Sequence, residues 1–449
     1  MREESHRGIA LSKRPWILLL STTLASSLVP FLSSSVSVAL PAIAESVSIS
    51  ISKANWVNNS FLIPLAASVL IAGRIGDWWG RGRVYLLGLL MFVASSALIL
   101  VPSNDFHLLL LTRAFQGISG AFVTSVAVSL LSEAFPPNMR GRVIGINTMA
   151  VYVGLSLGPM LGGALTSFLG WRSIFLFSLI ISALSLSLAL RSVDIGRGSM
   201  NPPKAPESAV FLASTALIAT GTSLMAIPVA GAGLVALGTA AFIALLLFEK
   251  RRGALIHPAL LRPRLVMSYS AAMLNYSATF ALTVLLSLYL ENMKGVTPFE
   301  AGMVLTIQPV IQAALSPVAG FMAEKVDPSM IATIGMGIIA YGIFSLIPVI
   351  SINRISLLYA SLALLGIGFA LFASPNTTAV VSLTPREAYA SSLAFLATMR
   401  YFGQALSTSV IISVESLISS IESSIFVSLE IYVTLSIIGT ILSYLARKR

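Results

Sequence analysis

Long runs of apolar residues separated by short polar stretches make up most of the chain from residue 16 onward. Each run is long enough to cross the hydrocarbon core of a bilayer, which is about 30 Å thick. There are fourteen, at residues 16–40, 56–74, 83–101, 106–132, 142–166, 171–190, 209–226, 231–248, 267–290, 299–322, 330–350, 356–374, 389–413 and 424–445. The pattern therefore predicts an all-α integral membrane protein with about 14 transmembrane helices.

The composition agrees with a membrane protein and narrows its class. The chain is 56% hydrophobic and 10% charged, whereas soluble domains are about one quarter charged. Its net charge of +11 does not indicate nucleic-acid binding, because the basic residues are spread over short loops. There is no Cys, and the three His residues lie far apart in sequence, so we expect no metal and no cofactor.

Basic residues are distributed unevenly between the two predicted membrane faces. With the N-terminus inside, 22 of the 28 Lys and Arg residues fall in cytoplasmic segments and four in outer loops. Such a bias orients membrane proteins, because positive loops are retained in the cytoplasm. We therefore predict a multi-pass protein of the cell membrane with both termini cytoplasmic.

The stretch Gly73–Arg83 joins two of the predicted spans and carries a motif. It reads G-R-I-G-D-W-W-G-R-G-R, with Gly73, Asp77, Gly80 and Arg81 in the pattern G-x-x-x-D-x-x-G-R. The pattern resembles the loop between helices two and three of the major facilitator superfamily of secondary transporters. That resemblance implies a role in gating for these four residues.

A second acid lies four residues after a glycine later in the chain, at Gly320 and Glu324. This echo of the Gly73 motif favours two related halves and adds Glu324 to the gating candidates. We therefore expect an N-terminal six-helix half at 1–190 and a linker with two extra helices at 191–264. A C-terminal six-helix half would follow at 265–449.

Small residues recur in the run at 142–166, at Gly154, Gly158, Gly162 and Gly163, with Pro159 between them. Small side chains four residues apart allow another helix to approach closely, and the proline can kink its own helix. The pattern G-x-x-x-G-P-x-x-G-G resembles the fifth-helix signature of the exporting antiporters of the superfamily. It therefore favours export over uptake.

Several polar residues lie at membrane depth and are candidates for substrate binding or ion coupling. Arg113 lies about seven residues inside its predicted helix, roughly 10 Å deep, where an arginine usually faces the bundle interior or a wet cavity. We favour a functional role for it over a structural one, and its stretch resembles the family's R-x-x-Q-G. The candidates are Arg113, Gln116, Gln308, Gln312, Arg400, Gln404 and Glu430.

Neutral members of this set also have a simpler interpretation as contacts between helices, and any one of them alone is better explained that way. Glu430 lies about 9 Å deep by helical rise. It can pair with Arg400, titrate as a proton carrier, or form a fixed structural contact, and we favour the last.

The resemblance extends to one branch of the superfamily. Val38–Ile43, Asn55–Leu65, His257–Arg264 and the R-x-x-G at Arg400 resemble the fourteen-helix drug:proton antiporters. That branch usually carries an Asp in helix one, but the corresponding stretch here reads F-L-S-S-S-V-S and has no acid. The identity of the coupling ion is therefore open.

A nucleotide-driven pump would need a phosphate-binding G-x-x-x-x-G-K-[ST] loop, and the chain has none. An enzyme would need clustered reactive side chains at membrane depth. The resemblance instead implies a monomeric, proton-coupled exporter of amphipathic or drug-like small molecules that works by alternating access. The alternative is an importer or uniporter of a small anionic metabolite held by Arg113 and Arg400.

Overall fold

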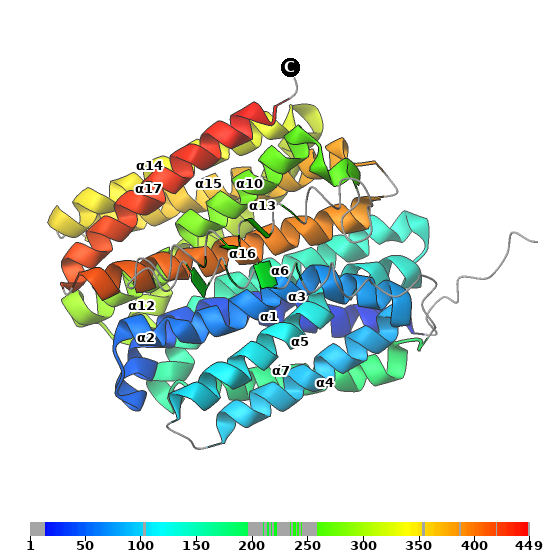
Figure 1. The fold of residues 1–449 in the computed structure, drawn as a ribbon, viewed down its shortest axis with the longest axis horizontal. Helices are drawn as coiled ribbons and strands as arrows, with labels where there is room; N and C mark the ends of the chain where they lie inside the picture. Colours follow the sequence, from blue (N-terminus) through cyan, green and yellow to red (C-terminus); the bar gives the residue numbers. More distant parts are fainter. Residues whose placement is uncertain are drawn as a thin grey trace, which may run out of the picture.

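The computed structural model describes residues 14–101, 105–195, 258–352, 355–385, 388–418 and 420–447, with scattered residues between 210 and 244. The first group of helices is α1 (Pro15–Val47), α2 (Ile51–Ala54), α3 (Trp56–Trp79), α4 (Arg81–Leu100), α5 (Phe106–Ala134), α6 (Pro137–Leu169) and α7 (Ser173–Ser192). The second is η1 (Pro258–Leu261), α10 (Pro263–Thr279), α11 (Leu282–Leu288), η2 (Tyr289–Met293), α12 (Pro298–Leu305), α13 (Ile307–Lys325), α14 (Pro328–Ile352), α15 (Ile355–Leu383), α16 (Tyr389–Leu417) and α17 (Ile421–Leu445). Figure 1 shows the long helices running side by side.

Eleven helices in the described part of the chain are long and apolar enough to cross a membrane. The long helix α16 is not among them, because it carries Arg400, Gln404 and many hydroxyl side chains. Its 29 residues nevertheless extend about 43 Å, enough to span a bilayer. The extra helices expected at 209–226 and 231–248 lie outside the described residues, so the total of fourteen stays a prediction.

Two spans of the second group are interrupted, each for a visible reason. Between α10 and α11, the N–H of Ala281 donates to Ser407 Oγ at 3.0 Å instead of continuing the helix ladder. Between α12 and α13, Pro309 has no N–H to return to Leu305, where α12 ends. Discontinuous helices of this kind often border the binding sites of transporters.

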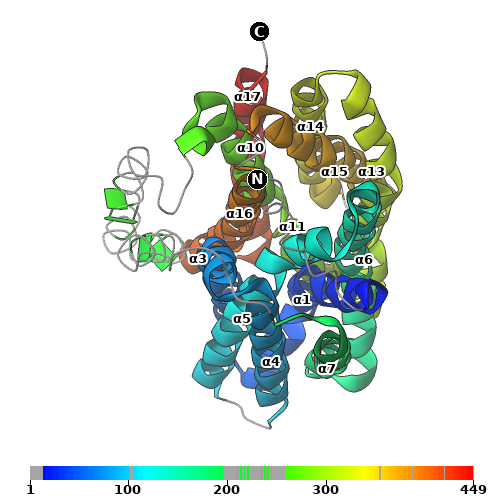
Figure 2. The same ribbon diagram turned by 90° about the vertical axis from the view of Figure 1, so that its right-hand side faces the viewer.

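The helices form two groups that face each other (Figure 2). Helices α1 and α3–α7 pack on one another and make the first half, and α10–α17 make the second. The halves meet where α3 lies on α16, α6 on α12 and α13, and α1 on α11. Because successive spans reverse direction, Arg14, Gly80, Glu133 and Arg447 share one end of the bundle, which we call the terminal end. Ser48, Gly170 and Gly295 lie at the other, the distal end.

Gly117 provides a test of how tightly the first half is packed. A Cβ on Gly117 would overlap the carbonyl oxygen of Phe61 on α3, whereas a Cβ on Gly337 of α14 would meet nothing within 4 Å. We expect Gly117→Ala to destabilise the protein by about 1–3 kcal/mol through overpacking. Gly337→Ala should be neutral or stabilising, because alanine favours the helix. Thermal unfolding of the purified variants measures both effects, and equal melting temperatures would contradict the packing described.

Candidate transport site and gates

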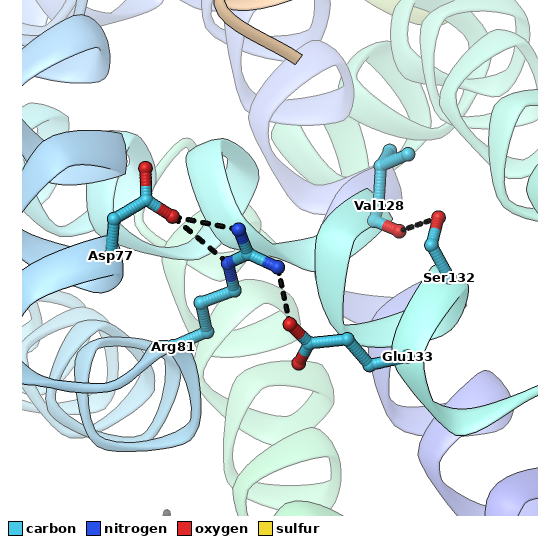
Figure 3. A network of polar contacts seen from close by, with 5 residues as sticks. All are labelled: Asp77, Arg81, Val128, Ser132 and Glu133. Atoms are coloured by element: carbon cyan, nitrogen blue, oxygen red, sulfur yellow. Dashed lines mark hydrogen bonds and ion pairs between the residues drawn. The ribbon is translucent and has the colours of Figure 1, made fainter. Parts of the chain in front are cut away.

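A charged cluster joins three helices of the first half at the terminal end (Figure 3). Gly80 has φ of 110°, a value that favours glycine, and it turns the chain between α3 and α4. This turn lets Arg81 Nη2 and Nε donate to Asp77 Oδ1 at 2.7 and 3.1 Å, while Nη1 pairs with Glu133 of α5. Arg81 therefore ties α4 to both neighbouring helices, and the expected gating role of Asp77 across the halves stays a prediction.

The second half has its own ion pair at the same end. Asp327 follows α13, accepts a hydrogen bond from the N–H of Ser329 at 3.0 Å, and pairs with Arg447 at 3.5 Å. Glu324, the candidate from the sequence echo, lies in the last turn of α13. The side chain of Glu324 lies outside the described part of the structure, and the described ion pair belongs to Asp327, three residues further along the chain.

The small residues of α6 divide between two neighbours. Added Cβ atoms on Gly154, Gly158 and Gly162 would overlap atoms of Ser27, Ser34 and Ser35 on α1. A Cβ on Gly163 would overlap the carbonyl of Pro298, and one on Gly302 would overlap the carbonyl of Pro159. The first contact binds α6 inside its own half. The second is reciprocal and brings the backbones of α6 and α12 together across the two halves at the distal end.

Arg113 lies entirely inside the first half, with no exposed surface. Its Nη1 donates to Gln116 Oε1 at 2.5 Å, its Nε donates to the carbonyl of Val57 at 3.2 Å, and its guanidinium lies 4.3 Å from the ring centre of Phe61. Nη2 has no hydrogen-bond partner. In this conformation a solute cannot reach Arg113, so its expected contact with substrate stays a prediction.

Gln116 extends this network to two more helices. Its Nε2 donates to Ser96 Oγ of α4 at 2.9 Å, and that hydroxyl lies 3.2 Å from Ser178 Oγ of α7. The described groups that link Arg113 to its neighbouring helices are therefore a backbone carbonyl, an amide and, through that amide, two hydroxyls, all of them neutral. Each hydrogen bond adds a partner for polar atoms that the apolar interior would otherwise leave unpaired.

Arg400, by contrast, lies between the halves. It is about 17 Å along α16 from the terminal end, close to the middle of the bundle. Its Nη2 donates to Thr377 Oγ1 at 2.7 Å, and its guanidinium lies 5.9 Å from the ring centre of Tyr276 on α10. Tyr152 of α6, in the other half, lies within electrostatic range of both Arg400 and Tyr276.

Further polar groups surround this position. Tyr401 of α16 lies beside Thr124 of α5, so a second pair of residues connects the halves at this depth. Arg400, Gln404, Tyr152, Tyr276 and Tyr401 are all partly exposed although they lie mid-bundle. They therefore lie away from both ends of the bundle, and each keeps some exposed surface. We call these five residues the central cluster.

Buried amides lie on the neighbouring helices. Gln312 on α13 is 1% exposed and neither of its amide atoms has a partner, and Asn376 on α15 is 2% exposed with Nδ2 unpartnered. Gln308, one turn before Gln312, lines a small pocket with Thr279, Thr283 and Phe369. Buried polar atoms usually have partners, so unpartnered ones beside a partly exposed cluster suggest groups that bind water or a ligand.

Glu430 does not take part in this cluster. The rotation of α17 buries Leu429 and Tyr432 and leaves Glu430 exposed. Arg400 bonds to Thr377 instead, and Arg113 lies inside the other half. Of the three roles left open for Glu430, pairing with Arg400 is not found in the described structure, because hydropathy locates a helix but does not fix which way each residue faces.

Two other carboxylates, Glu291 and Glu415, lie at the junction of the halves near the distal end. Ser287 Oγ bonds to Glu291, and the same hydroxyl lies 3.5 Å from the carbonyl of Val38 on α1. Glu415 lies beside Asn55, and its Oε2 is buried without a partner. The predicted runs stopped at residues 290 and 413, but η2 and α16 continue past them and include both acids, which are half-buried.

Uncharged hydrogen bonds join the halves toward the distal end. Asn59 of α3 donates through Nδ2 to Ser409 Oγ of α16 at 3.0 Å and accepts from Thr408 Oγ1. Ser156 Oγ of α6 donates to the carbonyl of Pro309 at 3.0 Å. With the contact of α6 and α12, these bonds hold the distal end together.

Comparisons with known proteins agree with this architecture. The family model of the Major Facilitator Superfamily matches residues 22–408 and 268–445, and the chain belongs to that family. It is 27% identical over 406 residues to the riboflavin transporter RibZ of Clostridioides difficile (strain 630), covering 88% of this chain and 87% of the relative. It is 26% identical over 385 residues to the tetracenomycin C resistance and export protein of Streptomyces glaucescens, covering 84% and 71%.

Among solved structures, an auto-inhibited POT family peptide transporter superposes with a TM-score of 0.74, covering 96% of this chain and 97% of that one. At 12% identity this likeness concerns the fold alone. The protein is thus a multi-pass membrane transporter of small molecules.

Replacing Gln116, which accepts a hydrogen bond from Arg113, tests whether the Arg113–Gln116 network stabilises the fold. Gln116→Leu would leave a fully buried guanidinium without its strongest acceptor, and breaking a buried charged contact costs about 3–5 kcal/mol. We expect a large fall in melting temperature. Gln404→Leu is the matched control, because that amide is partly exposed and its Oε1 has no partner to lose. Similar melting temperatures for the two variants would show that Arg113 does not need Gln116.

Proposed function

We propose that the protein exports amphipathic or drug-like small molecules by alternating access, in exchange for protons. The observation that carries this proposal is the central cluster, which draws on both halves and lies at mid-depth. It is partly exposed, while the distal end is held together. A solute bound there would be released to the opposite side when the halves rock about the site.

The direction of transport rests on charge and resemblance. The excess of Lys and Arg in the loops of the terminal end supports a cytoplasmic location for that end. The central cluster would then be loaded from the cytoplasm in the conformation described. The glycine pattern of α6 and the similarity to an antibiotic export protein both support export.

Proton coupling needs an acid that meets water in one state and is enclosed in another. Helix one offers only hydroxyls in this region, and Glu430 faces outward. We propose Glu415 and Glu291 instead, since both belong to the second half and lie against the first near the distal end. Opening of that end would hydrate them, so each could take up or release a proton once per cycle.

A second candidate is transport of a small anionic metabolite without export. Arg400 favours it, because the guanidinium has no ion pair among the side chains that the structure describes. The similarity to a riboflavin transporter also supports a metabolite as the solute. Either candidate uses the same central cluster.

Purified protein in proteoliposomes with an imposed pH gradient distinguishes these functions. A panel of cationic, neutral and anionic solutes should include at least one whose movement follows the gradient, against the direction of proton flow. Transport that ignores the gradient would remove antiport and leave the second candidate. Absence of movement for every solute would contradict both.

The distal contact can be tested by cross-linking, because the native chain has no Cys. We expect Asn59→Cys with Ser409→Cys to be joined by a short bifunctional thiol reagent and to stop transport, since the halves could no longer separate. Asn58→Cys with Ser409→Cys is the control, because Asn58 Nδ2 bonds to Ser37 of its own half. Undiminished transport by the fully cross-linked 59–409 pair would argue against alternating access at this end.

Neutral variants of the acids test the coupling. We expect Glu415→Gln or Glu291→Gln to abolish stimulation by a pH gradient while leaving exchange of labelled for unlabelled solute. Exchange requires the halves to rock but does not require a net proton step. Glu430→Gln, which changes an exposed acid, should keep the stimulation. If gradient stimulation survives in the double variant of Glu415 and Glu291, the protons travel by another route.

A further inference from the structure

The central cluster has one fixed positive charge and no matching negative charge. Arginine stays protonated in essentially any protein environment. Arg400 donates to the hydroxyl of Thr377 and, at 3.4 Å, to the carbonyl of Ala373, but neither neutralises it. Its Nε is buried without a partner. The described carboxylates in the same half that approach the interface, Glu291 and Glu415, belong to the distal end.

Unpartnered hydrogen-bonding atoms on α13, α15 and α16 match an anion with further polar groups. Gln404 lies one turn beyond Arg400, on the same face of α16, and its Oε1 is unpartnered. Gln312 and Asn376 add unpartnered amide atoms from α13 and α15, the latter next to the Thr377 that fixes Arg400. These amides both donate and accept, so they suit a solute with mixed polar groups rather than a bare inorganic ion.

Aromatic side chains supply the other half of the recognition. Tyr276 lies under the guanidinium, and its ring meets that of Phe369 edge to face at 6.0 Å between centres. Tyr152 approaches from the first half, and Tyr401 follows Arg400 in sequence. Tyrosines from α6, α10 and α16 therefore lie within electrostatic range of a single arginine, and Tyr276 is the one with a described ring contact to it. Rings can stack on a flat solute while the guanidinium binds its acidic group.

We propose that the central cluster selects aromatic organic anions, in which one carboxylate or similar acidic group is attached to a flat ring system. Arg400 binds the acidic group, the tyrosines contact the ring, and Gln312, Gln404 and Asn376 bind its remaining polar atoms. This inference rests on the proposed function, because it names the solute class of the same site. It also disfavours lipophilic cations, which would place a second positive charge beside Arg400 without a carboxylate to offset it.

Three probes that share one ring and differ in charge test this selection: 2-naphthoate, 2-naphthamide and 2-naphthylmethylammonium. Binding is measured with tritiated probes on purified protein in lipid nanodiscs, so that no gradient or transport step is involved. We expect naphthoate to bind at least about tenfold more tightly than the other two, because a hydrogen-bonded charge pair contributes about 1.5–3 kcal/mol. Equal or tighter binding of the ammonium or the amide, or no binding of naphthoate at millimolar concentration, would overturn the proposal.

Variants assign the effect to Arg400. Arg400→Gln should weaken naphthoate binding about tenfold to a hundredfold and leave naphthamide binding nearly unchanged. Arg400→Lys should recover part of the loss, since it restores the charge without the planar fork. Arg262→Gln, the same change at an exposed position before α10, should bind naphthoate like the native protein. Unaltered naphthoate binding by a folded, monodisperse Arg400→Gln protein would remove Arg400 from the site.

Transport of the same probes keeps the two hypotheses apart. If the ammonium is bound and moved while naphthoate is not, the anion selection is wrong and the transport function stands. If naphthoate binds through Arg400 and none of the three probes or the wider panel crosses the proteoliposome membrane, the assignment of the site stands and the proposed function fails.

Discussion

A charged or polar side chain at the depth of lipid hydrocarbon must find its partners inside the protein, because the surrounding lipid offers none. The two membrane arginines meet this requirement in opposite ways. Arg113 is enclosed by an amide, a carbonyl and aromatic faces within one half. Arg400 is only partly enclosed and lies where two mobile halves meet. The first arrangement holds four helices together, and the second leaves a charge available to a solute.

The contacts inside the first half and the contacts between the two halves also differ in their chemistry. Inside the first half at the terminal end, Arg81 bridges two acids and ties α4 to α3 and α5. Between the halves at the distal end, the contacts are neutral hydrogen bonds and backbone approaches at Gly163 and Gly302. A neutral hydrogen bond contributes about 0.5–1.5 kcal/mol net, and water can replace it at little loss. The described contacts between the halves at this end are therefore of a kind that water can replace, as the proposed alternating access requires.

The positions of the helices could be predicted from the sequence, because each apolar run marks a stretch that can span the membrane. Twelve predicted runs coincide with helical spans of the structure, and the glycine spacing of α6 identified a helix that is closely packed on two sides. The side of its helix on which a residue lies could not be predicted as well from the sequence. Glu430 was a candidate by depth alone, yet α17 turns it outward. Glu415 was not among the candidates, because α16 is one turn longer than its apolar run. Tyr152 was missed because a tyrosine in an apolar run has no signal of its own until two helices are brought together.

In the proposed transport cycle, the position of Arg400 links solute binding to the movement of the halves. Its guanidinium is held by α15 and α16 of one half, whereas Tyr152 reaches it from the other. A solute that touched only Arg400 would bind equally well in every conformation and would shift no equilibrium. A solute whose ring also contacts Tyr152 obtains this additional favourable binding free energy only in conformations in which the halves are close. Its anionic group would then provide affinity in every conformation. Its ring would provide the difference in affinity between conformations that is needed to draw the halves together.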